Sequence, residues 1–167
     1  LYTRIVTCPI YRGLPWAKTH IWIVDERRVP ETDDKSNAKM IRETLVSHVD
    51  INTRRFHTVP VAEEDNAATI YDQEVRDVVG DGQQRTRRAD EPPRIDVVLL
   101  GMGDDCHTAS LFPESPALKE GKRLVVGNDG PKVTPPARIT MTYPLINAAR
   151  EIAVLVIGAK KTKALGR

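Results

Sequence analysis

Four apolar runs limit what this chain can fold into more than any other feature of its sequence. Near-continuous Val, Ile and Leu, rather than strict alternation of apolar and polar residues, is typical of strands covered on both faces, as in a parallel sheet. We therefore predict four mostly buried strands, at "HIWIV" (20–24), "IDVVLL" (95–100), "RITMTY" (138–143) and "EIAVLVI" (151–157). Two weaker candidates are "RFHTV" (55–59) and "RLVV" (123–126).

Helical patterns lie between these runs. Ser36 can cap a helix that runs to about Val49, because apolar residues follow it at spacings of three and four. A second pattern runs from about 62 to 79, and Gly80 is placed to end it. Strands that alternate with helices predict the α/β class, here a Rossmann-like, mainly parallel sheet flanked by helices.

Composition and charge narrow the class of protein. The 167 residues, 40% of them hydrophobic, are enough for one core, so we expect a single α/β domain over 1–167. The 25 basic and 23 acidic residues are well mixed, and the short basic cluster "RTRR" (85–88) falls in a polar stretch at 81–93 that predicts an exposed loop. No apolar run is long enough to span a membrane. We expect neither nucleic acid nor a membrane as partner, and a small anionic substrate fits this balance.

The cysteines and the two ends of the chain give further expectations. Cys8 and Cys106 are too few for a disulfide framework, and the sequence shows no signal peptide, so we predict a cytoplasmic location. The chain opens with "LYTRIV", without an initiator Met, and closes with "KKTKALGR", which looks like a helix barely begun. We therefore expect the fold to be truncated at both ends.

Polar residues follow three of the predicted strands. In open parallel sheets, ligands bind outside the carboxyl ends of the strands. Asp25, Glu26 and Arg27 follow the first strand, residues 101–107 follow the second, and Gly158 with three lysines follows the last. These exits predict that carboxylates, an imidazole and cations converge at one edge of the sheet.

The segment "GMGDDCHTASLFP" (101–113) carries the main candidates for chemistry. His107 is the natural general acid or base, and Asp105 can hydrogen-bond its ring. Gly101 and Gly103 would let backbone amides approach a ligand, and a helix starting at His107 would aim N–H groups at an anion. The alternative is that a glycine-rich turn with one histidine is only a turn.

Arginine and lysine side chains are candidates for binding an anion. Arg27 and Arg28 in "DERRVP" (25–30) match phosphate or carboxylate oxygens, although a solvated turn is the plainer interpretation. Arg138 and Lys161 have similar alternatives as surface cations. His20, His48 and His57 are expected to be structural or exposed. We predict no metal site, because the consecutive ligand types at 105–107 rarely converge on one ion.

These motifs together resemble the 6-phosphogluconolactonase family, in the wider group that includes glucosamine-6-phosphate isomerase/deaminase. "DERRVP" followed by "SN" (36–37) is similar to the family's D-E-R-x-V-P and S-N, and 101–113 is similar to its G-x-G-x-D-G-H-T-A-S-L-F-P. The matches continue in "PPARITMTYPLINAAR" (135–150) and "GAKK" (158–161). The deaminase branch has H-I-A-F-N-E-P and D-E-Y at the corresponding places, so the lactonase is the better match.

The resemblance implies hydrolysis of 6-phosphoglucono-δ-lactone to 6-phosphogluconate in the oxidative pentose phosphate pathway, without a metal or organic cofactor. It makes His107 the general base that activates water and Asp105 the group that orients it. The residues that it implies for binding the sugar-phosphate lactone are Arg27, Gly101, Gly103, Thr108, Arg138 and Lys161. We expect no other partner, and we expect a monomer or weak homo-oligomer.

Two departures from the family pattern leave alternatives open. The family has Gly where Cys106 stands, and a side chain there would strain a turn that needs positive φ. The family's G-G-S-T-P phosphate loop, which precedes the position of "LYTRI", is absent from the sequence. The alternatives are a non-catalytic sugar-phosphate sensor domain and a glucosamine-6-phosphate deaminase/isomerase.

Overall fold

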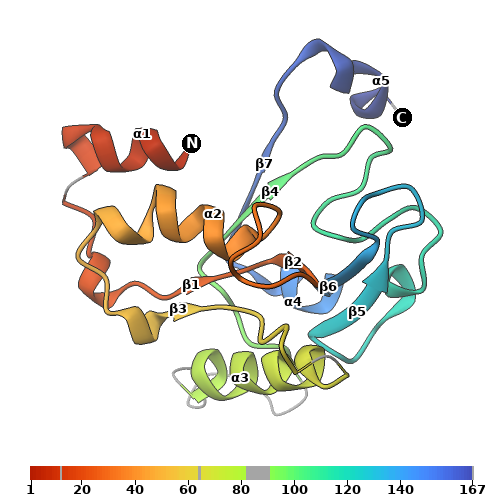
Figure 1. Cartoon of the computed structure of the whole chain (residues 1–167), viewed down its shortest axis with the longest axis horizontal. Coiled ribbons are helices and arrows are strands. Elements are labelled where there is room, and N and C mark those ends of the chain that lie inside the picture. The colour runs from red at the N-terminus through yellow and green to blue at the C-terminus, as the bar shows by residue number, and fades with distance from the viewer. Residues whose placement is uncertain (12, 64, 82–90, 167) are drawn as a thin grey trace.

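The computed structural model describes residues 1–11, 13–63, 65–81 and 91–166 (Figure 1). Most of the predicted loop at 81–93, including its "RTRR" cluster, lies outside the described residues. The elements in chain order are α1 (Tyr2–Thr7), β1 (Ile21–Trp22), β2 (Asp25–Arg27), α2 (Asn37–Thr44), β3 (Phe56–His57), α3 (Ala67–Asp81), β4 (Val97–Gly101), β5 (Val125–Asp129), β6 (Ala137–Met141), α4 (Tyr143–Ala148), β7 (Glu151–Leu155) and α5 (Thr162–Leu165).

Parallel strand pairs and flanking helices confirm the predicted α/β class. β1 pairs in parallel with β3, and β4 pairs in parallel with β7. In Figure 1, β1 and β3 pass between α2 and α3, whereas β4 and β7 extend away from them toward α5. The run at 138–143 differs from expectation, because β6 is antiparallel to both of its neighbours, β2 and β5.

The helices follow the predicted patterns with shifted ends. Ser36 caps α2 as expected, because its Oγ accepts a hydrogen bond of 3.1 Å from the Lys39 amide. α2 ends at Thr44, and a short 3₁₀ turn covers 46–48 instead of the last predicted helical turn. α3 begins at Ala67 and runs through Gly80, so the prediction that Gly80 ends it is wrong.

The core forms where the helices pack on the central strands. Ala67, Tyr71 and Val75 of α3 recur every four residues and are at most 1% exposed. The Tyr71 hydroxyl is 2.8 Å from the Ile23 amide, which donates to it, and it lies 3.1 Å from the carbonyls of Ile23 and His57. This hydroxyl satisfies backbone groups just beyond β1 and in β3, and so ties α3 to both strands.

The strands differ in how far they are covered. β6 has four buried residues in succession, as predicted from its apolar sequence. β4 alternates instead, with Val98 and Leu100 buried and Val97 and Leu99 exposed, and every residue of β7 is exposed. The expectation that these two strands are covered on both faces is therefore wrong, because the described residues pack on only one face of β4. No described helix is both long and apolar enough to cross a lipid bilayer.

A stacked cluster of rings supports the β1–β3 pair. The His57 ring is parallel to Trp22, with centroids 3.7 Å apart, and His57 is 5% exposed, which confirms a structural role. Its Nδ1 lies 2.5 Å from Glu74 Oε1 and its Nε2 lies 2.9 Å from His20 Nδ1. The contact between His20 Nδ1 and His57 Nε2 holds a single proton, because a proton on each nitrogen would set two N–H groups face to face.

The free energy of unfolding is expected to depend on His20. Burial, and then the charges of His57 and Arg55, hold the pKa of His20 below its ordinary value of 6.5. As the pH falls, His20 is therefore protonated in the unfolded chain before it is protonated in the folded chain. The stability that His20 contributes is fully present above the unfolded pKa of about 6.5 and is lost as the pH falls through the lower folded pKa. Between about pH 7.5 and about pH 5, the free energy of unfolding measured in urea should fall more steeply for the native sequence than for His20→Asn. The asparagine keeps a hydrogen-bond donor but does not titrate. Equal slopes would contradict this.

Candidate active site

Residues from β2, β4 and β6 and from the segments beside them line one cavity of about 530 Å³. The lining comes from β2 and the residue before it, from the end of β4 and the segment after it, from the start of α2, and from the start of β6 and the segment before it. The residues are Val24, Asp25, Arg27, Asn37, Leu99, Leu100, Gly101, Gly103, His107, Ala109, Phe112, Val133, Thr134 and Arg138. The predicted convergence is thus confirmed for the exits of the first two strands.

His107 and Asp105 form a hydrogen-bonded pair at this cavity. Asp105 Oδ1 lies 2.5 Å from His107 Nδ1 and also accepts from the His107 amide at 3.3 Å. Partial burial favours the neutral acid, but these hydrogen bonds outweigh it and hold the pKa of Asp105 below its usual value. A carboxylate beside Nδ1 favours the tautomer with its proton there, so Nε2 keeps the lone pair that can accept a proton.

Gly103 leaves the space that the imidazole occupies. A Cβ atom on Gly103 would lie 2.2 Å from His107 Cε1 and Nδ1 and 2.8 Å from Asp105 Oδ1. The Gly103 amide also donates to the His107 carbonyl at 2.8 Å, which closes the turn. The absence of a side chain here is a steric requirement of the His107–Asp105 pair.

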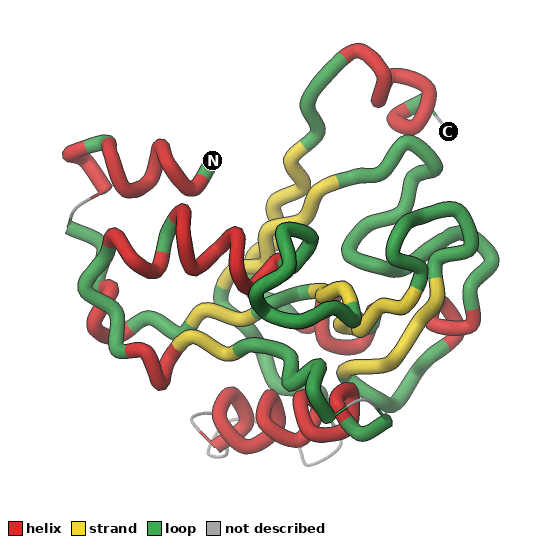
Figure 2. Tube along the Cα trace, in the orientation of Figure 1, coloured by secondary structure: helices red, strands yellow, loops and turns green. Residues whose placement is uncertain are grey.

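The turn that carries His107 is not the start of a helix, so that prediction is wrong. Figure 2 shows that the chain between β4 and β5 is mostly loop, and Thr108 forms an isolated bridge with Leu111. Cys106 and Ala109 have φ values of +73° and +50°, which a right-handed helix cannot contain. The expectation that the position of Cys106 needs positive φ is confirmed.

Arg27 lines the cavity, and one nitrogen of its side chain has no hydrogen-bond partner among the described residues. Its Nη1 donates to the Lys35 carbonyl at 2.7 Å, which fixes one end of the guanidinium. Among the described residues, its Nε is buried without a hydrogen-bond partner. A buried donor of this kind costs free energy unless an acceptor meets it, and a bound anion would supply one.

Arg138 brings a second guanidinium to the same cavity. It is 7% exposed, which excludes the interpretation of a surface cation, and its Nε donates to the Pro135 carbonyl at 2.9 Å. Burial, and then the charge of Arg27, lower the pKa of Arg138, against the opposing effect of Asp25 and Glu26. Two like charges in one partly desolvated space favour the binding of an anion between them.

Asp25 and Asn37 are residues of the cavity that the sequence did not single out as site residues. Asp25 Oδ2 accepts a hydrogen bond of 2.7 Å from the buried Ser110 hydroxyl, and its Oδ1 lies 3.4 Å from Asn37 Nδ2. Asn37 Nδ2 also donates to the Asp25 carbonyl at 2.7 Å. The strand-exit pattern contained the signal for Asp25, whereas the signal for Asn37 was the "SN" (36–37) of the family motif.

Three other predicted site residues lie differently. Lys161 and Thr108 are not among the described residues that line the cavity: Lys161 pairs with Asp104, and Thr108 Oγ1 donates to the Gly101 carbonyl at 2.9 Å. Gly101 lines the cavity, but a Cβ there would meet no atom within 4 Å. Lys161 therefore forms an ion pair with the loop after β4 and does not line the cavity.

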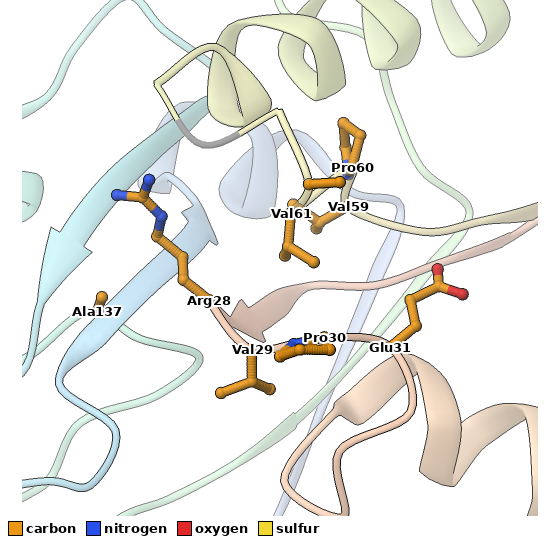
Figure 3. A pocket seen from close by; sticks show the side chains of 9 residues that line it. Arg28, Val29, Pro30, Glu31, Val59, Pro60, Val61 and Ala137 are labelled. Carbon is orange, nitrogen blue, oxygen red and sulfur yellow. The ribbon is translucent and has the colours of Figure 1, made fainter.

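A separate cavity of about 680 Å³ has none of these residues. Figure 3 shows Arg28 and Ala137 on one side of it and Glu31 on the other, with Val29, Pro30, Val59, Pro60 and Val61 between them. Glu31 forms an ion pair with Arg42, with Oε2 and Nη2 3.1 Å apart. Arg28, the neighbour of Arg27, thus belongs to a different space.

The chemistry of the first cavity follows from its side chains. It combines an imidazole oriented by a carboxylate with two guanidinium groups, which suits proton transfer on an anionic substrate. Among the described residues, no group of three or more His, Cys, Asp or Glu side chains is arranged to hold a metal ion.

Comparisons with known proteins agree with this arrangement. The sequence profile described as Glucosamine-6-phosphate isomerases/6-phosphogluconolactonase matches residues 1–167. The 6-phosphogluconolactonase of Mycobacterium tuberculosis (strain ATCC 25618 / H37Rv) is 40% identical over 158 residues, which cover 91% of this chain and 61% of that protein. The GDH/6PGL endoplasmic bifunctional protein of Homo sapiens is 41% identical in an alignment of 168 positions that covers 96% of this chain and 20% of that protein.

Solved structures share the fold. The 6-phosphogluconolactonase from Trypanosoma cruzi superposes with a TM-score of 0.84 at 28% identity, over 99% of this chain and 66% of that one. A structure described as devB protein gives a TM-score of 0.86 at 28% identity, with the same coverage. The chain thus spans about three fifths of the mycobacterial relative and two thirds of these structures.

Substituting Gly103 should disturb His107 and leave the rest of the fold in place. We expect Gly103→Ala to push the ring away from Asp105 and to lower the free energy of unfolding by about 1–3 kcal/mol, the usual cost of overpacking. Gly101→Ala is the matched control, because its Cβ meets open space. Urea unfolding of both variants measures the difference, and equal stabilities would refute the steric role of Gly103.

Proposed function

The chain belongs to the glucosamine-6-phosphate isomerase/6-phosphogluconolactonase family, and from this premise we propose that the protein hydrolyses 6-phosphoglucono-δ-lactone to 6-phosphogluconate. The observation that carries the proposal is the oriented His107–Asp105 pair in one cavity with Arg27 and Arg138. The names of the Mycobacterium and Trypanosoma relatives support the same substrate.

In the proposed reaction His107 acts as a general base. Its Nε2 takes a proton from a water molecule while the water oxygen attacks the lactone carbonyl carbon. Collapse of the tetrahedral intermediate breaks the bond to the ring oxygen, which receives the proton back from His107 and becomes a hydroxyl. Asp105 holds the Nδ1 proton throughout and stabilises the imidazolium that forms between the two steps.

The two guanidinium groups bind the substrate's phosphate in this proposal. A phosphate oxygen would satisfy the buried Nε of Arg27, and the fork of donors on Arg138 offers further hydrogen bonds. Gly101 and Gly103 line the same cavity and keep its wall free of side chains. Thr108 and Lys161 act indirectly, because both hold the loop that presents His107.

Several wider properties belong to the same proposal. Residues 1–167 form one α/β domain that is part of a longer lactonase-like domain, in keeping with the 61% of the mycobacterial relative that the chain covers. The steps above use only side chains and water. A cytoplasmic location and a monomeric or weakly self-associating state stay predictions.

Loss of His107 should remove catalysis. In the full-length protein, His107→Ala is expected to lower kcat/KM for freshly generated lactone by about 10²–10⁴-fold, because the general base is gone. His48→Ala is the control, since His48 lies on the surface with its Nε2 on the Glu43 carbonyl. A blank without enzyme corrects for spontaneous ring opening.

Two further measurements on the same protein would replace the proposal with another function. Binding of 6-phosphogluconate without any rate above the blank would identify a sugar-phosphate sensor. Release of ammonia from glucosamine 6-phosphate would identify a deaminase.

Arg27 should govern affinity for the phosphate. We expect Arg27→Ala to raise KM by about tenfold or more, because a charge-assisted hydrogen bond to the substrate is lost. Arg28→Ala removes the same charge from the next residue, whose side chain lines the other cavity (Figure 3), and should change KM little. Steady-state kinetics of both variants decide the matter, and an equal rise in both would show an effect of net charge instead of contact.

A further inference from the structure

The carboxylate of Glu26 joins β2 to the N-terminus of α2. Glu26 stands between Asp25 and Arg27, the two residues of β2 that line the active-site cavity, and it is 2% exposed. We infer that Glu26 is a positioning residue, whose carboxylate fixes Arg27 and Asn37 in the geometry that binds the substrate's phosphate end. This inference rests on the proposed function, since it concerns the same cavity.

Four donors converge on this carboxylate. Oε1 accepts from the Arg27 amide at 2.8 Å and from the Asn37 amide at 2.7 Å. Oε2 accepts from the Ala38 amide at 2.7 Å and from the Ser36 hydroxyl at 3.1 Å. Every donor except Arg27 belongs to the capping turn of α2, so the bonds span two separate segments of the chain.

The burial of this charge is possible because it is fully hydrogen-bonded. An isolated carboxylate in the interior is strongly unfavourable, but amide donors at the start of a helix and the helix dipole both stabilise negative charge. Burial and the charge of Arg27 lower the pKa of Arg138, and the charge of Glu26 acts in the opposite direction. The position therefore accepts a carboxylate and disfavours a neutral side chain of the same size.

One oxygen holds the backbones of two residues of the cavity. Because the Arg27 and Asn37 amides share Oε1, a displacement of that oxygen moves both residues together. Asn37 then passes the constraint on, since its Nδ2 donates to the Asp25 carbonyl at 2.7 Å. The Ser36 hydroxyl on the second oxygen also caps α2, through the Lys39 amide at 3.1 Å.

A glutamine at this position would keep the shape and break the pattern. The amide of Gln has one accepting oxygen, and its NH₂ group would face N–H donors at the other position. Either the pair at Arg27 and Asn37 or the pair at Ser36 and Ala38 would lose its acceptor. The arginine should then sample other positions, which weakens phosphate binding more than it slows proton transfer at His107.

The test compares full-length native protein with Glu26→Gln and with a matched control, Ile41→Val. Ile41 is a buried residue of α2, so its variant perturbs the same helix without touching the carboxylate. We expect Glu26→Gln to raise KM for the lactone and the calorimetric Kd for 6-phosphogluconate by about tenfold each, with a smaller change in kcat. Ile41→Val should lower the melting temperature and leave KM and Kd unchanged.

The outcomes separate this inference from the proposed function. Native protein that hydrolyses the lactone, with an unaltered KM in Glu26→Gln, would overturn the inference alone. Native protein without lactonase activity, whose 6-phosphogluconate binding still weakens in Glu26→Gln, would overturn the proposed function alone. Native protein that neither hydrolyses nor binds would overturn both. If Glu26→Gln fails to fold, Ser36→Ala removes one of the four bonds and should raise Kd in the same direction, and an unchanged Kd would count against the inference.

Discussion

The backbone pairing of β6 with β2 and β5 is the constraint on which the rest of this molecule depends. Its ladder sets Arg27 opposite Arg138 and Asp25 opposite Thr140, so it fixes which side chains of two distant segments meet. The same strand contributes the most continuous burial in the structure and ends in the core with Met141. Because the pairing is antiparallel, the start of β6 lies beside the end of β2, and two guanidinium groups are held near each other despite their repulsion.

Much of the cavity could be predicted from the order of residues along the chain. Arg27, Gly103 and His107 each follow an apolar run, and the ends of strands on one side of a sheet meet in space, so local sequence was enough to group them. The apolar pattern also predicted the class of fold and the Ser36 cap. Burial could not be predicted for β7, because it depends on which element packs against a strand and not on the strand's own residues.

The parts that could not be predicted depend on contacts between distant residues. The helix expected from His107 is replaced by loop, where the buried Ser110 donates to Asp25 and its amide bonds to Thr140. Such bonds outweigh the weak helical preference of a short segment. Asn37 was missed for a similar reason, since the sequence cannot show that the start of α2 meets the end of β2.

The positive φ of Cys106 also bears on how this turn can change over generations. At +73°, a residue with a Cβ atom pays a conformational cost that glycine avoids, although the neighbouring bonds of Asp105 and His107 form with cysteine in place. Either cysteine codon becomes a glycine codon by a change of its first base, so one nucleotide change is enough for this replacement. A glycine at this position would therefore remove a conformational cost, whereas a change of Asp105 or His107 would remove the hydrogen-bonded pair itself.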